Sequence, residues 1–146
     1  MYQYLDLVNT VLKKGVLRTN RTGVNTLMCF GYHYKVDLNN GFPLLTTKKV
    51  FFSSIVHELL WYLKGETHIR NLRKHTKIWD AWTNENKNWE IGKMYGYQWV
   101  KWEQFVKDKE TGNYKKNYIN QIKEVIDLIK NNPNSRRMIV TAWNPS

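Results

Sequence analysis

The sequence predicts an α+β fold, in which helices and strands occupy separate stretches of the chain. Several stretches repeat apolar residues at helical spacing, another alternates apolar and polar residues as a strand does, and the strands are not neighbours in sequence. The chain has 146 residues, of which 42% are hydrophobic, and it contains no repeat and no Pro/Gly-rich linker. We therefore expect residues 1–146 to belong to one folded domain.

The first two helices are marked by clear ends. Apolar residues over positions 4–12 recur at helical spacing and stop before Gly15, which predicts an amphipathic helix at the start of the chain. A second, longer helix is predicted to be capped by Ser53 or Ser54 and to end at Gly65.

The remaining elements are shorter or more polar. A short helix is predicted from Thr67 through Leu72, and an amphipathic helix over 119–129 that Asn131–Pro133 terminates. Residues 107–116 are polar and charged, and we expect them to form an exposed excursion.

Strand signals appear at two places. Residues 28–38 alternate between apolar and polar side chains, which predicts a strand followed by a turn at Asn39–Gly41. Residues 138–143 are rich in β-prone side chains and predict a second strand. Cys29 lies in the first of these strands, where no neighbour in sequence would activate it, so we expect it to pack rather than to react.

Composition restricts the class of protein. The single cysteine, Cys29, excludes an internal disulfide and a cysteine-based zinc cluster, and it fits a reducing, cytoplasmic location. No apolar run approaches the roughly 18 residues of a membrane span, and the N-terminus lacks a signal-peptide pattern. No histidine pair has metal-ligand spacing, so no metal is expected. The net charge of +11 indicates a basic surface, either merely solvated or attractive to phosphates and nucleic acid.

Three features are candidates for function, and each also has a structural explanation. Arg136 and Arg137 enter a β-prone run and either grip an anion or form a solvated pair. Glu58 flanks the apolar stripe of its helix and either moves protons or is an ordinary surface residue. Trp79 and Trp82 either stack on a planar ligand or pack in the core.

Six short motifs follow one another along the chain. They are Arg21-Thr22-Gly23, Gly41-Phe42-Pro43-Leu44-Leu45-Thr46-Thr47-Lys48, His57-Glu58-Leu59-Leu60-Trp61, Ile78-Trp79-Asp80-Ala81-Trp82, Tyr95-Gly96-Tyr97-Gln98-Trp99, and the stretch from Ser135-Arg136-Arg137 to Ala142-Trp143-Asn144-Pro145. Each alone is weak. In this order they cover essentially the whole chain, which resembles the N-terminal half of the folate-dependent thymidylate synthase family.

The resemblance implies a fold and a reaction. The fold would be a three-layer arrangement with a mixed sheet and packed helices, of which residues 1–146 are the N-terminal part of a single domain, incomplete at its C-terminus. The reaction would be reductive methylation of dUMP to dTMP, with 5,10-methylenetetrahydrofolate as cosubstrate and no metal. The enzyme would be a cytoplasmic homodimer.

The resemblance also implies roles for residues that bind the nucleotide. Arg21 would contact the dUMP phosphate from its own subunit, and Arg136 and Arg137 would reach the partner's nucleotide across the dimer interface. Planar guanidinium groups suit phosphate oxygens better than a lysine ammonium does. Glu58 would manage protons at the pyrimidine ring through ordered water, and Tyr95 would orient the water around the base.

On the folate side, the family's motif implies four contacts. Trp79 would pack on the folate and on the reacting intermediate, and Ile78 and Trp82 would complete that wall, whereas Lys48 would lie near the negative tail. The cysteine nucleophile of the family would lie beyond Ser146, and Cys29 is not its counterpart. We therefore expect residues 1–146 to be inactive by themselves.

Two other functions are compatible with parts of the sequence. A pyrimidine nucleotide hydroxymethylase of the same fold shares the arginine pair and the glutamate, and the residues that choose between uracil and cytosine would lie beyond Ser146. A basic nucleic-acid-binding module would explain the charge and predicts salt-dependent binding. The complete segments at 78–82 and 95–99 favour the synthase, so neither nucleic acid nor membrane is expected as a partner.

Overall fold

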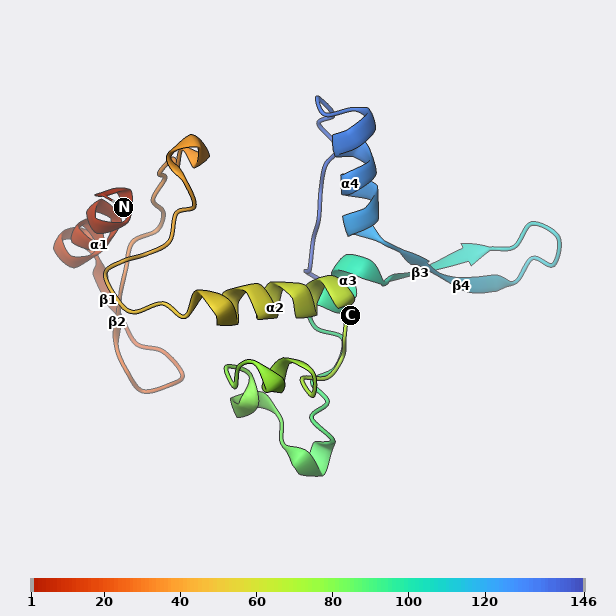
Figure 1. Ribbon diagram of the computed structural model, residues 1–146, viewed down its shortest axis with the longest axis horizontal. Helices are drawn as coiled ribbons and strands as arrows, with labels where there is room; N and C mark the ends of the chain where they lie inside the picture. Colours follow the sequence, from red (N-terminus) through yellow and green to blue (C-terminus); the bar gives the residue numbers. More distant parts are fainter. Residues whose placement is uncertain (1, 146) are drawn as a thin grey trace. The chain divides into compact units, whose positions relative to one another are not determined.

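The structure, a computed structural model, describes residues 2–145, which form two compact units that divide between Val50 and Phe51 (Figure 1). We call them unit 1 and unit 2. Both combine helices with a small antiparallel sheet, which confirms the predicted α+β class. The strands that are described form two separate antiparallel pairs rather than one mixed sheet, and the three-layer arrangement stays a prediction.

Unit 1 begins with one α-helix and a short hairpin. Helix α1 spans Tyr2–Lys14 and ends where the Gly15 N–H donates to the Val11 carbonyl at 2.8 Å, as the sequence predicted. Strands β1 (Val16–Arg18) and β2 (Thr26–Met28) then pair antiparallel. No described residue of this unit is fully buried.

The prediction of a strand over residues 28–38 is correct only for its first residue, Met28. Strand β2 ends at Met28, and the chain then runs without a pairing partner to the single-turn helix η1 (Leu38–Asn40). The Asp37 carboxylate caps that turn by accepting the Asn39 N–H at 2.9 Å, and Gly41 follows with φ 99°, so the predicted turn is present. Alternating apolar and polar side chains do not by themselves form a strand, because the backbone N–H and C=O groups also need a neighbouring strand as hydrogen-bond partner.

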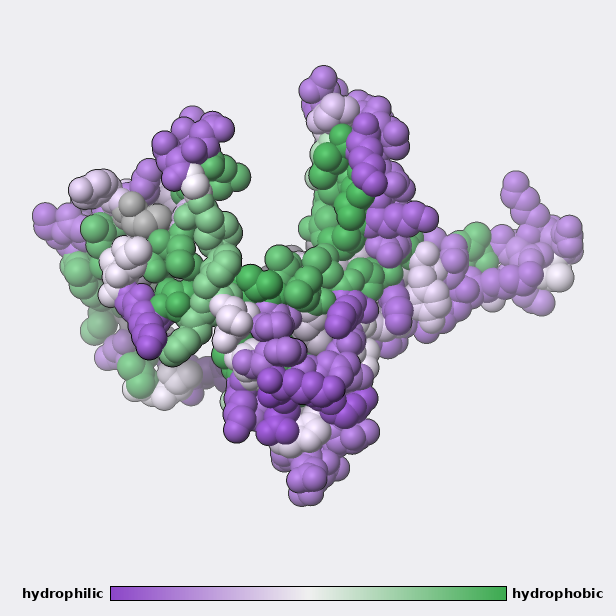
Figure 2. All heavy atoms as spheres, viewed as in Figure 1, coloured by the Kyte–Doolittle hydropathy of each residue, from purple (hydrophilic) through white to green (hydrophobic). Residues whose placement is uncertain are grey.

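Unit 2 begins with α2 (Phe52–Lys64), which ends at Gly65 as predicted. Gly65 has φ 62°, a left-handed conformation that glycine adopts without steric cost. The start of the helix differs from the prediction, because Phe51 occupies the cap position with no side-chain hydrogen bond, and both candidate serines lie in the first turn. The apolar stripe predicted for this helix is present and largely exposed (Figure 2). Its members, each 38–48% exposed, are Phe52, Ile55, Val56, Leu59, Leu60 and Leu63.

Helix α3 (Tyr95–Val100) packs directly on α2, and a glycine permits this contact. A Cβ atom at Gly96 would lie 2.4 Å from the carbonyl oxygen and 2.5 Å from the Cα atom of Tyr62. Any larger residue would therefore push the two helices apart. This helix was not predicted from the sequence, because six residues are too few to show a repeating apolar pattern.

A β-ribbon and a further helix complete unit 2. Strands β3 (Trp102–Lys107) and β4 (Tyr114–Ile119) pair antiparallel, and the turn that joins them lies within residues 107–116, which are almost all exposed, as predicted. Helix α4 (Gln121–Asn131) follows, as predicted, and the Asn120 side chain caps it by accepting the Lys123 N–H at 2.9 Å.

The strand predicted over residues 138–143 is not formed, and the backbone groups of Thr141 in this stretch bond to a glutamine side chain. The Thr141 N–H donates to Gln121 Oε1 at 2.9 Å, and Gln121 Nε2 donates to the Thr141 carbonyl at 3.0 Å and to the Gln98 carbonyl at 2.8 Å. This buried glutamine ties the segment to α3 and α4 in place of a neighbouring strand.

The buried core of unit 2 lies under α2. It consists of Trp61, Ile69 and Leu72. The Trp61 indole donates to the His68 carbonyl at 2.8 Å. The short helix predicted from Thr67 through Leu72 is not formed. The chain there makes an isolated β-bridge at His68 and turns, and then enters η2 (Leu72–Lys74). Two more single-turn helices follow, η3 (Asp80–Trp82) and η4 (Glu85–Lys87). Among residues 2–145, no helix is both long enough and apolar enough to span a membrane.

Candidate active site

The Glu58 carboxylate lies on α2, where two side chains donate to the same oxygen. Trp79 Nε1 donates to Glu58 Oε1 at 2.6 Å, and the Tyr62 hydroxyl, one helical turn further along, donates to it at 3.5 Å. The second carboxylate oxygen, Oε2, accepts no hydrogen bond from the residues that the structure describes. Glu58 is half-buried, so its partners hold it in place while Oε2 stays available.

Aromatic rings surround Tyr62 and bring the neighbouring segments together. The ring centroid of Tyr62 lies 6.4 Å from that of Trp79, 6.0 Å from that of Tyr95 and 5.4 Å from that of Trp99. The first two contacts are edge-to-face, the geometry that aromatic quadrupoles favour. We call these four residues the Tyr62 cluster. It joins α2, the segment before η3, and α3, and thus gathers three of the predicted site residues, Glu58, Trp79 and Tyr95, in one region.

Burial in this cluster raises the pKa of Tyr62 well above its usual value, and the nearby negative charge of Glu58 raises it further. Desolvation disfavours the phenolate, and a carboxylate next to it disfavours a second negative charge. The hydroxyl group of Tyr62 therefore keeps its proton and remains a donor toward Glu58.

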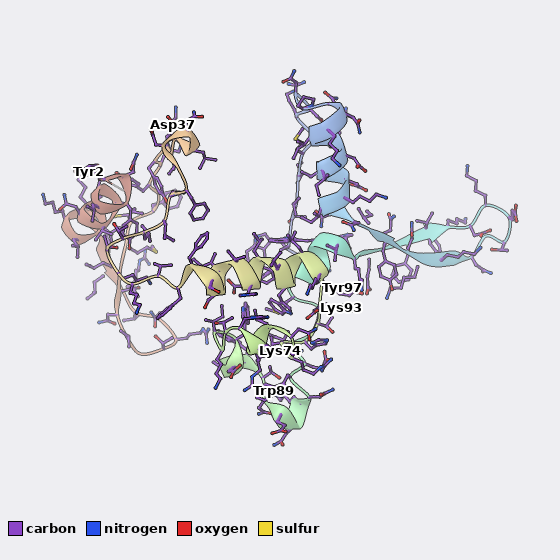
Figure 3. The ribbon with its side chains drawn as sticks, viewed as in Figure 1. Tyr2, Asp37, Lys74, Trp89, Lys93 and Tyr97 are labelled. Atoms are coloured by element: carbon purple, nitrogen blue, oxygen red, sulfur yellow. The ribbon has the colours of Figure 1, made fainter. Side chains whose placement is uncertain are left out.

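The tryptophan segment is held by an arginine that sequence reasoning missed. Trp79 and Trp82 lie with ring centroids 5.0 Å apart, and Trp82 is exposed. Between them, Asp80 accepts two hydrogen bonds from Arg73, at 2.9 and 3.2 Å. The Arg73 guanidinium also lies 3.4 Å above the ring of Trp89 (labelled in Figure 3), a cation–π contact. A fork-to-fork pair of this kind fixes the segment, although no local pattern relates positions 73 and 80.

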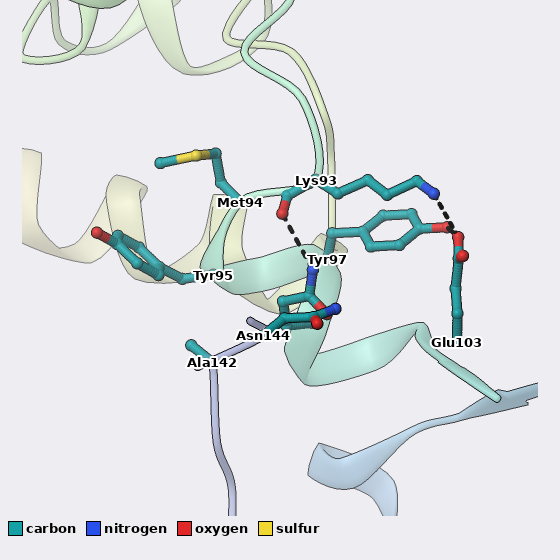
Figure 4. A pocket seen from close by; sticks show the side chains of 8 residues that line it. Lys93, Met94, Tyr95, Tyr97, Glu103, Ala142 and Asn144 are labelled. Atoms are coloured by element: carbon teal, nitrogen blue, oxygen red, sulfur yellow. Dashed lines mark hydrogen bonds and ion pairs between the residues drawn. The ribbon is translucent and has the colours of Figure 1, made fainter. Parts of the chain in front are cut away.

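A cavity of about 280 Å³ opens beside Tyr95 (Figure 4). Its wall contains Lys93, Tyr97 and Glu103 on one side and the segment of Asn144 on another. The residues that line it are Lys93, Met94, Tyr95, Tyr97, Gln98, Glu103, Ala142 and Asn144.

Three donors converge on the Glu103 carboxylate. Lys93 Nζ lies at 2.6 Å, the Tyr97 hydroxyl at 2.9 Å and Lys116 Nζ at 2.9 Å. The hydrogen bonds from Lys93, Lys116 and Tyr97 lower the pKa of Glu103 to about 2. Burial and the bond to Glu103 raise the pKa of Tyr97 to about 12. These residues do not stand out as a group in the sequence, because they come from α3, β3, β4 and the segment before α3.

Replacing Glu103 by glutamine should remove a pH-dependent part of the stability of unit 2. The folded-state pKa lies below the usual value of 4.5, so the ionised carboxylate stabilises the fold above pH 4.5, and this stabilisation is lost as the pH falls toward 2. Urea unfolding at several pH values should show wild type and Glu103→Gln differing at pH 7 and converging near pH 2. Glu110→Gln removes a carboxylate in the exposed turn and should leave the pH profile unchanged. A constant difference across this range would contradict the assignment.

The arginines predicted to hold phosphate lie at exposed positions in both units. Arg136 and Arg137 follow α4 in unit 2, where the Arg137 N–H donates to Ser135 Oγ at 3.2 Å. Arg21 lies in unit 1, in the loop between β1 and β2, which the Asn20 carboxamide shapes by accepting the Thr22 N–H at 2.9 Å. In the part of the chain that the structure describes, none of the three guanidinium groups forms an ion pair.

The chain matches a known protein family over nearly its whole length. The sequence model of the thymidylate synthase family matches residues 2–146. The chain belongs to the thymidylate synthase family. Thymidylate synthases are methyltransferases of dTMP biosynthesis that bind dUMP and folate and are typically dimeric. The family membership confirms the resemblance that the six motifs indicated.

The thymidylate synthase motifs are thus partly assembled within unit 2. The contacts described above join Glu58, Trp79, Trp82 and Tyr95, whereas no hydrogen bond, ion pair or ring contact given for the described residues joins them to Arg136 or Arg137. Ile78 is exposed next to Trp79, and Lys48 is exposed in unit 1. The catalytic and binding roles of these residues stay predictions.

Cys29 and the histidines have other surroundings. Cys29 is a free thiol in unit 1 whose sulfur lies 4.0 Å from the Thr10 carbonyl oxygen, a contact consistent with packing. His57 stacks on His75, with centroids 3.7 Å apart. No group of three or more histidine, cysteine, aspartate or glutamate side chains suited to a metal ion occurs among the described residues.

Proposed function

We propose that this chain supplies the dUMP-binding and proton-handling residues of a thymidylate synthase, which converts dUMP to dTMP by reductive methylation with 5,10-methylenetetrahydrofolate. The observation that carries the proposal is the Glu58 carboxylate, hydrogen-bonded to Trp79 at 2.6 Å beside the Tyr62 cluster. A carboxylate at an aromatic wall, next to a hydroxyl donor, suits a reaction that moves protons on a planar ring.

Glu58 would act through its second oxygen. Because Trp79 and Tyr62 both donate to Oε1, the carboxylate is oriented and Oε2 is left to accept or release a proton through ordered water at the pyrimidine O4 and C5 atoms. Proton transfer by a positioned group of this kind contributes typically about 10²–10⁴-fold to a rate. Tyr95, at the edge of the Tyr62 cluster, would hold the water around the base.

Two residues beside Trp79, together with a lysine of unit 1, have the chemistry that a folate requires. Trp82 is exposed at 5.0 Å from Trp79 and offers a ring face to a flat pterin, and Ile78 adds an exposed apolar side chain. The exposed ammonium group of Lys48 has the charge that the anionic tail requires. When bound, methylenetetrahydrofolate supplies the one-carbon unit and the hydride.

The dUMP phosphate would be held by arginines from two subunits of a homodimer. Arg21 would bind the nucleotide of its own subunit, and Arg136 and Arg137 that of the partner. The three guanidinium groups are exposed and unpaired among the described residues, which supports a role in binding an external dianion. A phosphate dianion takes several bidentate donors, and a guanidinium group provides two parallel N–H bonds.

Nuclear magnetic resonance of the tryptophan indole protons tests the proposal directly. Titrating residues 1–146 with dUMP should shift the Trp79 indole N–H resonance, because this proton bonds Glu58 beside the proposed base site. The resonance is assigned with Trp79→Phe. The indole of the exposed Trp143 should not move. No shift of Trp79 at saturating dUMP, or equal shifts of both indoles, would contradict the proposal.

The polypeptide of residues 1–146 by itself should not release tritium from dUMP labelled at C5. Release requires a thiolate to add to C6 of the ring, and the only thiol in these residues is Cys29, which packs on the Thr10 carbonyl in unit 1. Tritium release by the purified polypeptide would contradict this part of the proposal, and its abolition by Cys29→Ser would then identify Cys29 as the nucleophile.

A further inference from the structure

The Arg73 side chain contacts two segments of unit 2, the single-turn helix η3 and the loop that follows η4. Its Nε and Nη2 atoms donate to the two carboxylate oxygens of Asp80 at 2.9 and 3.2 Å. Its guanidinium carbon lies 3.4 Å from the centroid of the Trp89 ring. A carboxylate bonds the edge of the guanidinium group and a ring packs against its face, which leaves the group little freedom to turn.

The backbone that carries Arg73 is attached to the core of unit 2. Arg73 lies in η2, directly after the buried Leu72, and its N–H donates to the Ile69 carbonyl at 2.9 Å. Ile69 has no exposed surface. The Arg73 side chain therefore holds its partners at a fixed place relative to the core.

The ring that packs on Arg73 belongs to a tryptophan in an unusual backbone conformation. Trp89 has φ 57°, in the left-handed region that bulky residues avoid. Its N–H donates to the Asn84 carbonyl at 3.0 Å, and its carbonyl accepts the Ile69 N–H at 3.0 Å. A conformation of this kind persists only where its surroundings compensate the cost. The cation–π contact with Arg73 adds to these bonds, so the ring and the guanidinium group hold each other.

Asp80 connects this support to the tryptophans of the proposed site. It lies in η3 between Trp79 and Trp82, and among the described residues its carboxylate bonds only Arg73. The backbone hydrogen bonds of η3 are local, from the Asp80 N–H to the Lys77 carbonyl at 3.1 Å and from the Trp82 N–H to the Trp79 carbonyl at 3.2 Å. These bonds shape the turn but do not attach it to the core.

The orientation of η3 decides how its two tryptophans face the site. Trp79 Nε1 donates to Glu58 Oε1 at 2.6 Å, and the ring of Trp82 lies exposed at 5.0 Å from that of Trp79. Hydrogen bonds weaken steeply when donor and acceptor are misaligned. Two parallel bonds from a guanidinium group fix both the distance and the rotation of the Asp80 carboxylate, whereas a lysine ammonium would fix only the distance.

We infer that Arg73 is a positioning residue of the proposed site, which sets through Asp80 the direction from which Trp79 donates to Glu58. No hydrogen bond or ion pair among the described residues joins Arg73 to Glu58 itself. Position 73 lies outside the six motifs, so the family resemblance does not imply this role. The inference rests on the proposed function, because Arg73 has a role in the reaction only if Glu58 and Trp79 belong to the site.

Hydrogen exchange of the Trp79 indole proton, followed by nuclear magnetic resonance without dUMP, tests the inference. Arg73→Lys keeps the charge and removes the two parallel bonds. The Trp79 proton should then exchange at least about fivefold faster, because its bond to Glu58 is loosened. Arg70→Lys is the matched control, since Arg70 pairs with Glu90 at 3.2 Å and forms no bond to η3 among the described residues. It should change the exchange rate less than about twofold.

Stability and dUMP affinity separate positioning from a purely structural role. Both lysine variants weaken a partly exposed ion pair, so urea unfolding should show similar, small decreases of the midpoint. The affinity for dUMP, read from the Trp79 resonance, should fall about three- to tenfold for Arg73→Lys and change less than about twofold for Arg70→Lys.

A double-mutant cycle verifies that Arg73 acts through Asp80. Asp80→Asn should speed the exchange of the Trp79 proton about as much as Arg73→Lys does. The double variant should exceed either single change by no more than about twofold, because both remove the same contact.

Three results would overturn the inference. These are an unchanged Trp79 exchange rate or dUMP affinity in Arg73→Lys, equal effects of Arg73→Lys and Arg70→Lys on the Trp79 proton, and additive effects in the cycle. Failure of the proposed function gives a different result, because dUMP would then leave the Trp79 resonance of the wild type unmoved. The exchange rate needs no ligand and reports on Arg73 in either case.

Discussion

Replacing Arg136 and Arg137 together by alanine should weaken the binding of dUMP by at least about 100-fold. A hydrogen bond to a charged group contributes about 1.5–3 kcal/mol, so two guanidinium groups on the phosphate contribute about 3–6 kcal/mol. Both side chains are exposed and form no ion pair among the described residues, so their removal should cost little stability. Isothermal titration of dUMP into wild type and variant measures the change.

Two controls separate phosphate binding from a general loss of positive charge. Lys123→Ala with Lys130→Ala removes the same charge from exposed positions on the neighbouring helix α4 and should weaken dUMP binding less than about threefold. Deoxyuridine, which lacks the phosphate, should bind wild type and the arginine variant equally. Unchanged dUMP affinity in the double arginine variant would remove these residues from the phosphate site.

Trp61→Ala should unfold unit 2 or bring it close to unfolding. Trp61 is the largest of the three buried apolar side chains, and truncating a buried tryptophan costs about 3–5 kcal/mol. The change also removes the indole donor, 2.8 Å away, from the His68 carbonyl. With only Ile69 and Leu72 left in the core, few other buried contacts resist the loss.

Urea unfolding followed by near-ultraviolet circular dichroism measures this effect. Trp143→Ala is the matched control, because Trp143 is 89% exposed and the hydrogen bond that its backbone N–H donates to Thr141 Oγ1 does not need the side chain. It should change the unfolding midpoint only slightly. Equal midpoints for Trp61→Ala and wild type would show that the core is not where the structure places it.

The sequence predicted those elements whose determinants are local. The helices α1, α2 and α4 have apolar periodicity. Each ends at or near a residue that stops helices, which is Gly15, Gly65 or Pro133, and that residue is visible in the sequence. The motifs also predicted that Glu58, Trp79 and Tyr95 belong to one site, and the structure brings them together around Tyr62. What the motifs did not indicate is that Tyr62 itself links them, since its position one turn after Glu58 reads as part of an apolar stripe.

The elements that depend on distant partners were not predictable in the same way. Residues 28–38 and 138–143 have the composition of strands, but the first finds no neighbouring strand and the second bonds to the Gln121 side chain. The sequence predicted only that residues 107–116 are exposed. The pairing of β3 with β4 was not predicted, because it involves positions up to 17 apart, as Trp102 with Ile119. The donors around Glu103 come from α3, β4 and the segment before α3, and no local pattern relates them.

The exposed stripe of α2 affects how the stability of unit 2 varies with temperature. Hydration of newly exposed apolar surface is the main source of the heat-capacity increase on unfolding. Side chains such as Ile55, Leu59 and Leu63 already meet water over part of their surface in the folded chain, so they add less newly hydrated area when the helix melts than buried side chains would. The heat-capacity step per residue should therefore be small, and the curve of unfolding free energy against temperature correspondingly flat.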